Sequence, residues 1–198
     1  MRPLLGLLHG ERCGAHRLLT AIAVALSVPA ALAAAATGEP PDVTIDRDGE
    51  AYTVSAQFVV PQPPDVVLEV LTDFEGIPRF VPDIARSVVV EQNGTTRVVE
   101  QEAVSHAMMF SKRVHLQLVV EEAPDGLTFR DRLGRSFRRY EGQWRLTPCA
   151  SGTLVLYRLV ADPSFSVPSF VIRRVLSRDA GTMIEGLRAE MATRATRR

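Results

Sequence analysis

Few side chains in this sequence are suited to acid–base chemistry. His106 is a candidate general base, because an imidazole titrates near neutral pH. Asp73 lies two residues before Glu75, and this pair could exchange protons with a substrate, although Asp73 more simply caps or orients a short helical turn. His106 and His115 do not have the spacing of a metal site, and no cysteine cluster accompanies them. We therefore expect neither a metal nor a cofactor.

The segment 136–147 carries the strongest candidates for ligand binding. Alternation places Arg138, Tyr140 and Trp144 on the face that also carries Leu146, and we expect this face to point inward. Tyr140 and Trp144 offer broad apolar rings with one polar group each. Trp144 is more simply interpreted as core, whereas Tyr140 could equally be core or a ligand contact. Arg138, next to Tyr140 on that face, could pair with an anionic group of a ligand.

Apolar side chains on neighbouring segments complete the candidate site. They are Phe110, Leu116, Phe129, Met183 and Leu187. Methionine is flexible, so Met183 could adapt to a ligand of irregular shape or simply fill a gap.

A dense basic run lies close to these residues. It consists of Arg130, Arg132, Arg135, Arg138 and Arg139, with Lys112 and Arg113 on the preceding strand. Such a run could make transient contact with anionic lipid headgroups at a membrane surface. Because Asp131 and Glu141 are interspersed, most of it could instead be a solvated outer face.

Residues 1–36 have the layout of a secretory signal peptide. An uncharged apolar run at 18–36 follows three arginines and ends in small residues, which places cleavage after Ala33 or near Ala36. An uncleaved anchor is the alternative, because the run is close to the roughly 20 residues that span a bilayer. We expect cleavage, and a periplasmic or secreted protein.

The rest of the chain has the size of one domain. We expect a linker at 37–42 and a domain at 43–198, whose oligomeric state the sequence leaves open. The full sequence balances 23 basic against 23 acidic side chains, and residues 1–36 remove more basic than acidic ones. The slightly acidic remainder does not favour a nucleic-acid partner. Cys149 is its only thiol, so an internal disulfide is excluded.

Periodicity and turn signals predict an α+β fold. A strand at 52–58 precedes a short helix from Asp65 to about Phe74 and a second helical turn at 78–81. Asn93-Gly94 and similar turn signals then separate six predicted strands. They span about 84–92, 95–105, 109–122, 127–132, 136–147 and 152–161. Their short connections predict an antiparallel meander, and an amphipathic helix follows at 168–195.

This order of elements predicts a curved sheet with a hollow. The face of a seven-stranded sheet is wider than the one long helix that can cover it, so the sheet must curl around that helix. Curling leaves an apolar space, which suits a hydrophobic small molecule.

The segment from Leu71 to Ile84 (LTDFEGIPRFVPDI) resembles the helical signature of the polyketide cyclase/dehydrase and coenzyme Q-binding START-like proteins, members of the SRPBCC superfamily. Further matches are Phe137, Gly142-x-Trp144-x-Leu146, Gly152-Thr153 and Asp162-Pro163, and the resemblance covers about residues 52–192. It implies a helix-grip fold, in which a curved antiparallel sheet holds the C-terminal helix and two short helices close one end. Proteins of this type typically hold lipids, isoprenoids or polyketides, and a few are enzymes.

Three functions are compatible with these observations. The first is an exported protein that carries or sequesters a hydrophobic small molecule. The second is a cyclase or dehydratase that acts on a polyketide-like substrate in the same cavity through His106, Tyr140 or Asp73. The third is a module that docks a protein or a membrane and whose cavity is closed by side chains. We favour the first, because polyketide intermediates are normally made and held in the cytoplasm, whereas residues 1–36 predict export.

If residues 1–36 are a signal peptide, the full chain expressed in a Gram-negative host should yield a periplasmic form. The intact mass of that form should place its first residue after Ala33 or near Ala36. Leu26→Arg interrupts the apolar run and should leave the chain uncleaved in the cytoplasm. Recovery of the uncleaved wild-type chain from the membrane fraction would instead support an anchor.

Overall fold

Eight antiparallel strands form one sheet in the computed structural model. The structure describes residues 41–107, 110–166 and 168–197, with the backbone alone at 105–107 and 110–112. The strands are β1 (Asp42–Asp48), β2 (Ala51–Val60), β3 (Ile84–Asn93), β4 (Thr96–Ala107), β5 (Phe110–Ala123), β6 (Gly126–Asp131), β7 (Phe137–Cys149) and β8 (Gly152–Pro163). Their order across the sheet is β1-β2-β8-β7-β6-β5-β4-β3.

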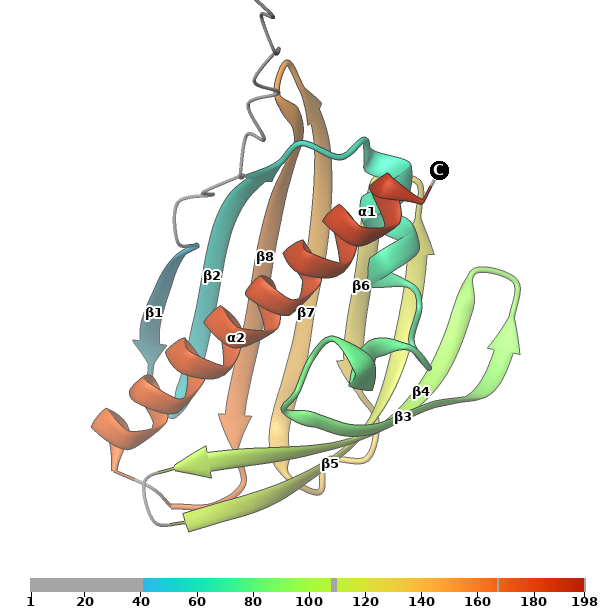
Figure 1. The fold of residues 1–198 in the computed structure, drawn as a ribbon. Helices are drawn as coiled ribbons and strands as arrows, with labels where there is room; N and C mark the ends of the chain where they lie inside the picture. Colours follow the sequence, from blue (N-terminus) through green and yellow to red (C-terminus); the bar gives the residue numbers. More distant parts are fainter. Residues whose placement is uncertain (1–40, 108–109, 167, 198) are drawn as a thin grey trace, which may run out of the picture. The chain divides into compact units, whose positions relative to one another are not determined.

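Three helical segments accompany the sheet: α1 (Pro64–Leu71), the 3₁₀ turn η1 (Ile77–Arg79) and α2 (Ser169–Thr196). The sheet bends so that β3, β4 and β5 run across the direction of β2 and β8, and α2 lies along its concave side (Figure 1). The α1 helix lies beside the C-terminal part of α2. The predicted fold class, an α+β helix-grip arrangement, is therefore confirmed. Within the described ranges, no helix has both the length and the apolar character needed to cross a bilayer.

The sheet has one strand more than the seven predicted. The additional strand, β1, pairs antiparallel with β2 at an edge of the sheet. Its sequence, DVTIDRD, has only two large apolar residues, Val43 and Ile45, both partly buried. Charged side chains are common on edge strands because they discourage pairing with other chains. The same charges weaken the alternation that would reveal the strand in the sequence.

Alternation marks the buried faces of β2 and β5. Every second residue of β2, from Tyr52 to Val60, is buried, and β5 buries Val114, Leu116 and Leu118 on the same pattern. On α2, the large buried residues Ile184, Leu187 and Met191 all lie in the C-terminal half. The C-terminal half of α2 therefore carries its large buried side chains, and α1 packs against α2.

Gly186 allows α2 to pass very close to the segment that follows η1. A Cβ atom at this position would lie 1.9 Å from the carbonyl oxygen of Phe80, which is much closer than atoms can approach. By contrast, a Cβ atom at Gly181, on the same helix, would meet nothing within 4 Å. Gly186 therefore serves close packing, whereas Gly181 lowers the helix propensity without any such contact.

Alanine substitutions at these two glycines should have opposite effects. We expect Gly186→Ala to lower the free energy of unfolding by about 1–3 kcal/mol, because the backbone must shift to admit the methyl group. Gly181→Ala should raise it by up to about 1 kcal/mol through helix propensity. Urea denaturation followed by circular dichroism measures both changes. A Gly186→Ala protein as stable as the wild type would contradict the close contact between α2 and Phe80.

Candidate functional site

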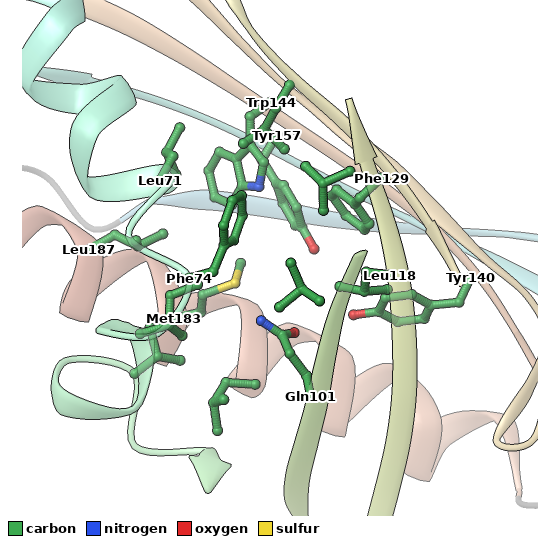
Figure 2. Close-up of a pocket in the computed structure, with 16 residues that line it drawn as sticks. Leu71, Phe74, Gln101, Leu118, Phe129, Tyr140, Trp144, Tyr157, Met183 and Leu187 are labelled. Atoms are coloured by element: carbon green, nitrogen blue, oxygen red, sulfur yellow. The ribbon is translucent and has the colours of Figure 1, made fainter. Parts of the chain in front are cut away.

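A cavity of about 120 Å³ lies between the sheet and α2. Strands β3 to β8, the C-terminal half of α2 and the segment from Leu71 to Val81, which we call the cover segment, all contribute to its wall. The lining residues are Leu71, Phe74, Ile77, Val81, Ile84, Val99, Gln101, Leu118, Val120, Leu127, Phe129, Tyr140, Trp144, Tyr157, Met183 and Leu187 (Figure 2). The wall is therefore largely apolar and uncharged.

Charged groups outside the cavity hold the cover segment in place. The carboxylate of Asp73 accepts hydrogen bonds from the Gly76 backbone N–H (3.1 Å), from Arg79 Nη2 (3.0 Å) and from Arg194 Nη2. Arg194, near the end of α2, also pairs with Glu190 at 2.9 Å and with Glu69 of α1 at 3.3 Å. Arg97 of β4 stacks over the ring of Phe74, 5.7 Å from its centroid. Asp73 therefore links the cover segment to α2.

Aromatic rings cover the sheet side of the cavity. The rings of Trp144 and Tyr157 lie opposite each other on β7 and β8, with centroids 4.3 Å apart. Phe129 of β6 pairs with Gly142 of β7, where a Cβ atom would lie 2.6 Å from the Phe129 ring. Gly142 thus makes room for the ring of Phe129 beside Tyr140. The ring centroids of Phe129 and Tyr140 are 6.1 Å apart. The result is a wall of flat faces, which suits a flat ligand.

Three uncharged polar side chains turn their ends toward this space. They are Tyr140, Tyr157 and Gln101, and Gln101 also donates a hydrogen bond to Ser87 Oγ at 3.2 Å (Figure 2). Burial raises the pKa of Tyr140 to about 12, and the negative charges of Asp179 and Asp131 act in the same direction. Burial, followed by the proximity of Tyr140, raises the pKa of Tyr157 well above its usual value. Both phenols are therefore neutral hydrogen-bond donors at physiological pH.

Five of the predicted ligand-binding residues line the cavity: Phe129, Tyr140, Trp144, Met183 and Leu187. Leu116 is buried in the core but does not line the cavity.

The other candidates lie outside the described lining. The side chains of Phe110 and of His106, the candidate base, are outside the described residues, as are Met108 and Met109. Asp73 binds the arginines of the cover segment and of α2 rather than facing the cavity.

The predicted inward orientation of Arg138 is wrong. Phe137 pairs with Pro163 and Arg139 with Asp162, so β7 holds one extra residue at Arg138 relative to β8. Such a bulge reverses the alternation on one side of it. As a result, Phe137 is buried with its ring 4.9 Å from that of Tyr140, whereas the side chain of Arg138 is 55% exposed. Arg138 Nη2 and Nε instead donate to Asp162 at 2.6 and 3.0 Å.

Three arginines of the basic run are engaged in exposed ion pairs. Arg132 pairs with Glu91 at 2.6 Å and Arg139 with Glu141, in addition to the Arg138 pair. The Glu91 pKa is lowered by its hydrogen bond from Arg132. Arg138 also lines a separate polar hollow of about 330 Å³ near the start of α2. These arginines therefore lie apart from the apolar cavity.

The sequence analysis missed Tyr157, Phe74 and Gln101 as lining residues. Alternation along β8 would have placed Tyr157 on the buried face with Val155 and Leu159. Pairing β8 with β7 would then have brought it opposite Trp144. Phe74 was treated only as part of a helical stripe, and Gln101 gave no signal because a polar residue on a strand is normally assigned to solvent. In the described part of the chain, no cluster of His, Cys, Asp or Glu side chains could hold a metal ion.

Comparison with known proteins identifies a protein family whose model matches most of the described chain. Residues 60–188 match the family model for polyketide cyclase/dehydrase and lipid transport proteins. No curated protein matches the sequence significantly.

Several solved structures share the fold. The Thermus thermophilus protein TTHA0849 is 23% identical with a TM-score of 0.62, and the match covers 71% of this chain and 97% of that one. A STAR-related lipid transfer protein of Xanthomonas axonopodis is 22% identical with a TM-score of 0.55, covering 76% and 98% of the two chains. The Zhui aromatase/cyclase of Streptomyces sp. R1128 is 15% identical with a TM-score of 0.63, covering 73% and 96%. These structural matches establish a common fold.

The buried phenols should make stability depend on pH in the alkaline range. In the unfolded chain Tyr140 and Tyr157 ionise near their ordinary pKa of about 10, whereas folding raises the pKa of Tyr140 to about 12. The free energy of unfolding should therefore be insensitive to these groups below about pH 10. It should fall between about pH 10 and 12, by at most about 1.4 kcal/mol per pH unit for each phenol.

Urea denaturation at about pH 9, 10.5 and 11.5 measures this slope. Tyr140→Phe should make the slope shallower, because one of the two phenols no longer contributes. An unchanged slope in that variant would contradict the burial of the Tyr140 hydroxyl.

Proposed function

The chain belongs to the polyketide cyclase/dehydrase and lipid transport family, and we propose that it is an exported protein that binds a hydrophobic small molecule as a carrier or sequestering protein. The observation that carries this proposal is the apolar cavity between the sheet and α2. Family and fold fit either a hydrophobic ligand-binding protein or a protein of polyketide cyclase type. The groups around the cavity favour the first.

The composition of the wall supports binding by burial of apolar surface. Its side chains are mainly aromatic and aliphatic. A ligand that removes their apolar area from water is stabilised in the cavity by about 25 cal/mol per Å² of buried area. The cavity of about 120 Å³ is smaller than the roughly 300–1,000 Å³ of typical ligand pockets. A ligand larger than one ring therefore requires the cover segment to move away from the sheet.

Cyclase or dehydratase chemistry would need a group that transfers a proton inside the cavity. Tyr140 and Tyr157 hold their protons well above neutral pH, so they donate hydrogen bonds but are poor bases. Asp73 is engaged by Arg79 and Arg194. The polar groups described in the wall are therefore suited to holding a ligand rather than to transferring its protons.

The third function, a docking module with a closed cavity, required side chains to fill the space between sheet and helix. The cavity beneath the cover segment argues against it. Export is part of the proposal through residues 1–36, whose basic start and apolar run are typical of a signal peptide. Contact with a membrane surface would provide a source of an apolar ligand. The exposed arginines on β6 and β7 favour a membrane surface that carries anionic headgroups.

Native mass spectrometry of the purified protein tests this proposal directly. We expect a population whose mass exceeds that of the chain by one small apolar molecule, released under denaturing conditions. Leu118→Trp should abolish this population, because Leu118 points into the cavity from β5 and a larger ring would occupy the space (Figure 2).

Leu133→Trp is the matched control, because it makes the same substitution at an exposed leucine. It should retain the bound molecule. Identical ligand occupancy in the wild type and both variants would mean that the ligand binds elsewhere and would refute the carrier proposal. A wild-type protein that never carries a ligand and takes none up from apolar extracts would refute it as well.

A further inference from the structure

Two phenol hydroxyls and one amide face a single apolar space, and we propose that they select a neutral ligand whose one ring carries a carbonyl or ether oxygen. This inference rests on the proposed function and names the chemical class of its ligand. Tyr140 of β7, Tyr157 of β8 and Gln101 of β4 approach the space from different strands (Figure 2). A single acceptor oxygen placed between the two hydroxyls could receive a hydrogen bond from each.

The two hydroxyls are available to a ligand. Tyr157 is 5% exposed, yet neither its hydroxyl nor that of Tyr140 forms a hydrogen bond with any residue that the structure describes. Neither hydroxyl is among the fully buried polar atoms that lack a partner, so both remain accessible. A hydrocarbon that covers them would leave both donors unpaired at a cost in free energy, whereas an acceptor oxygen would pair with them. A ligand with an acceptor oxygen should therefore bind more tightly in this cavity than a hydrocarbon of the same shape.

The electrostatics of the cavity disfavour an anionic ligand. No cationic side chain belongs to the described lining, and the carboxylates of Asp179 and Asp131 help to raise the pKa of Tyr140. The same negative charges oppose a carboxylate placed beside that hydroxyl, and burial opposes it further. Arg138, the cation that the sequence placed on this face, is engaged by Asp162 outside the cavity. A fatty-acid carboxylate therefore lacks a partner here.

Size and shape restrict the ligand to one ring in this conformation. The cavity of about 120 Å³ is comparable to an apolar protein cavity of about 150 Å³ that accepts benzene. Phe129 and Trp144 both lie on the sheet side and can contact one face or the edge of such a ring. For a longer molecule, the same site would hold the oxygen-bearing ring while the remainder displaces the cover segment.

Three probes of nearly equal shape test this selection. They are acetophenone, which has a carbonyl group, α-methylstyrene, which replaces that oxygen by a CH₂ group, and benzoate, which is anionic. Trp144 is the only tryptophan in the chain, so its indole N–H gives one resonance in ¹H–¹⁵N spectra and reports occupancy of the cavity. We expect acetophenone to bind about fivefold to tenfold more tightly than α-methylstyrene, as one or two hydrogen bonds would give. Benzoate should bind at least about tenfold more weakly than acetophenone.

Conservative variants test whether the two tyrosine hydroxyls cause the preference for acetophenone over α-methylstyrene. Tyr140→Phe and Tyr157→Phe should each bring the ratio of the two neutral affinities closer to one, with backbone resonances otherwise unchanged. Tyr52→Phe is the matched control, because this third tyrosine lines the separate polar hollow near the start of α2, and it should leave the ratio unchanged.

The outcomes separate this inference from the function on which it rests. Equal binding of acetophenone and α-methylstyrene, or tightest binding of benzoate, would overturn the inference and leave the ligand-binding function standing. If none of the three probes moves the Trp144 resonance, both are overturned. Should one phenylalanine variant fail to fold, the wild-type affinities and the other variant still decide.

Discussion

The mismatch in width between the eight-stranded sheet and its single long helix governs the structure. Neither the apolar face of the sheet nor the apolar stripe of α2 can remain in water, so the sheet bends around α2 until both are covered. The bend leaves the concave side incompletely filled beside the C-terminal half of the helix. The cover segment closes that end, and its position depends on Gly186, which admits it against α2, and on Asp73, which ties it to Arg194. The cavity is a consequence of these contacts.

Alternation and turn signals were sufficient to predict the fold, because burial on one face of a strand is a local property of its sequence. They predicted the buried faces of β2 and β5 and placed Tyr140 and Trp144 inward. The errors concern features that depend on pairing with a neighbouring strand. The bulge at Arg138 exists only relative to β8, and β1 is held only by β2. Tyr157 became part of the site because β8 pairs with β7, which places it opposite Trp144.

The chemistry of the site follows from the absence of charged side chains in the described wall as well as from the polar groups that face inward. The charged groups near the cavity serve its architecture: Arg97 stacks on Phe74, and Arg194 binds Asp73 outside the lining. The polar groups that face inward are uncharged, and low polarity keeps the two phenols protonated. Such a site combines apolar contact with a few directed hydrogen bonds, which is the general character of pockets that bind small neutral molecules.

The pairing of β2 with β8 has a consequence for the kinetics of folding. Tyr52 lies opposite Ala161, so strands from the two ends of the domain are neighbours in the sheet. Contacts between residues so distant in sequence slow folding. The chain must lose the conformational entropy of a long loop before such a contact contributes favourable free energy. The pairing of β2 with β8 also has to wait until β8, the last strand, has been synthesised. If the chain is exported, as we propose, this delay would keep it unfolded until it has passed through a translocation channel.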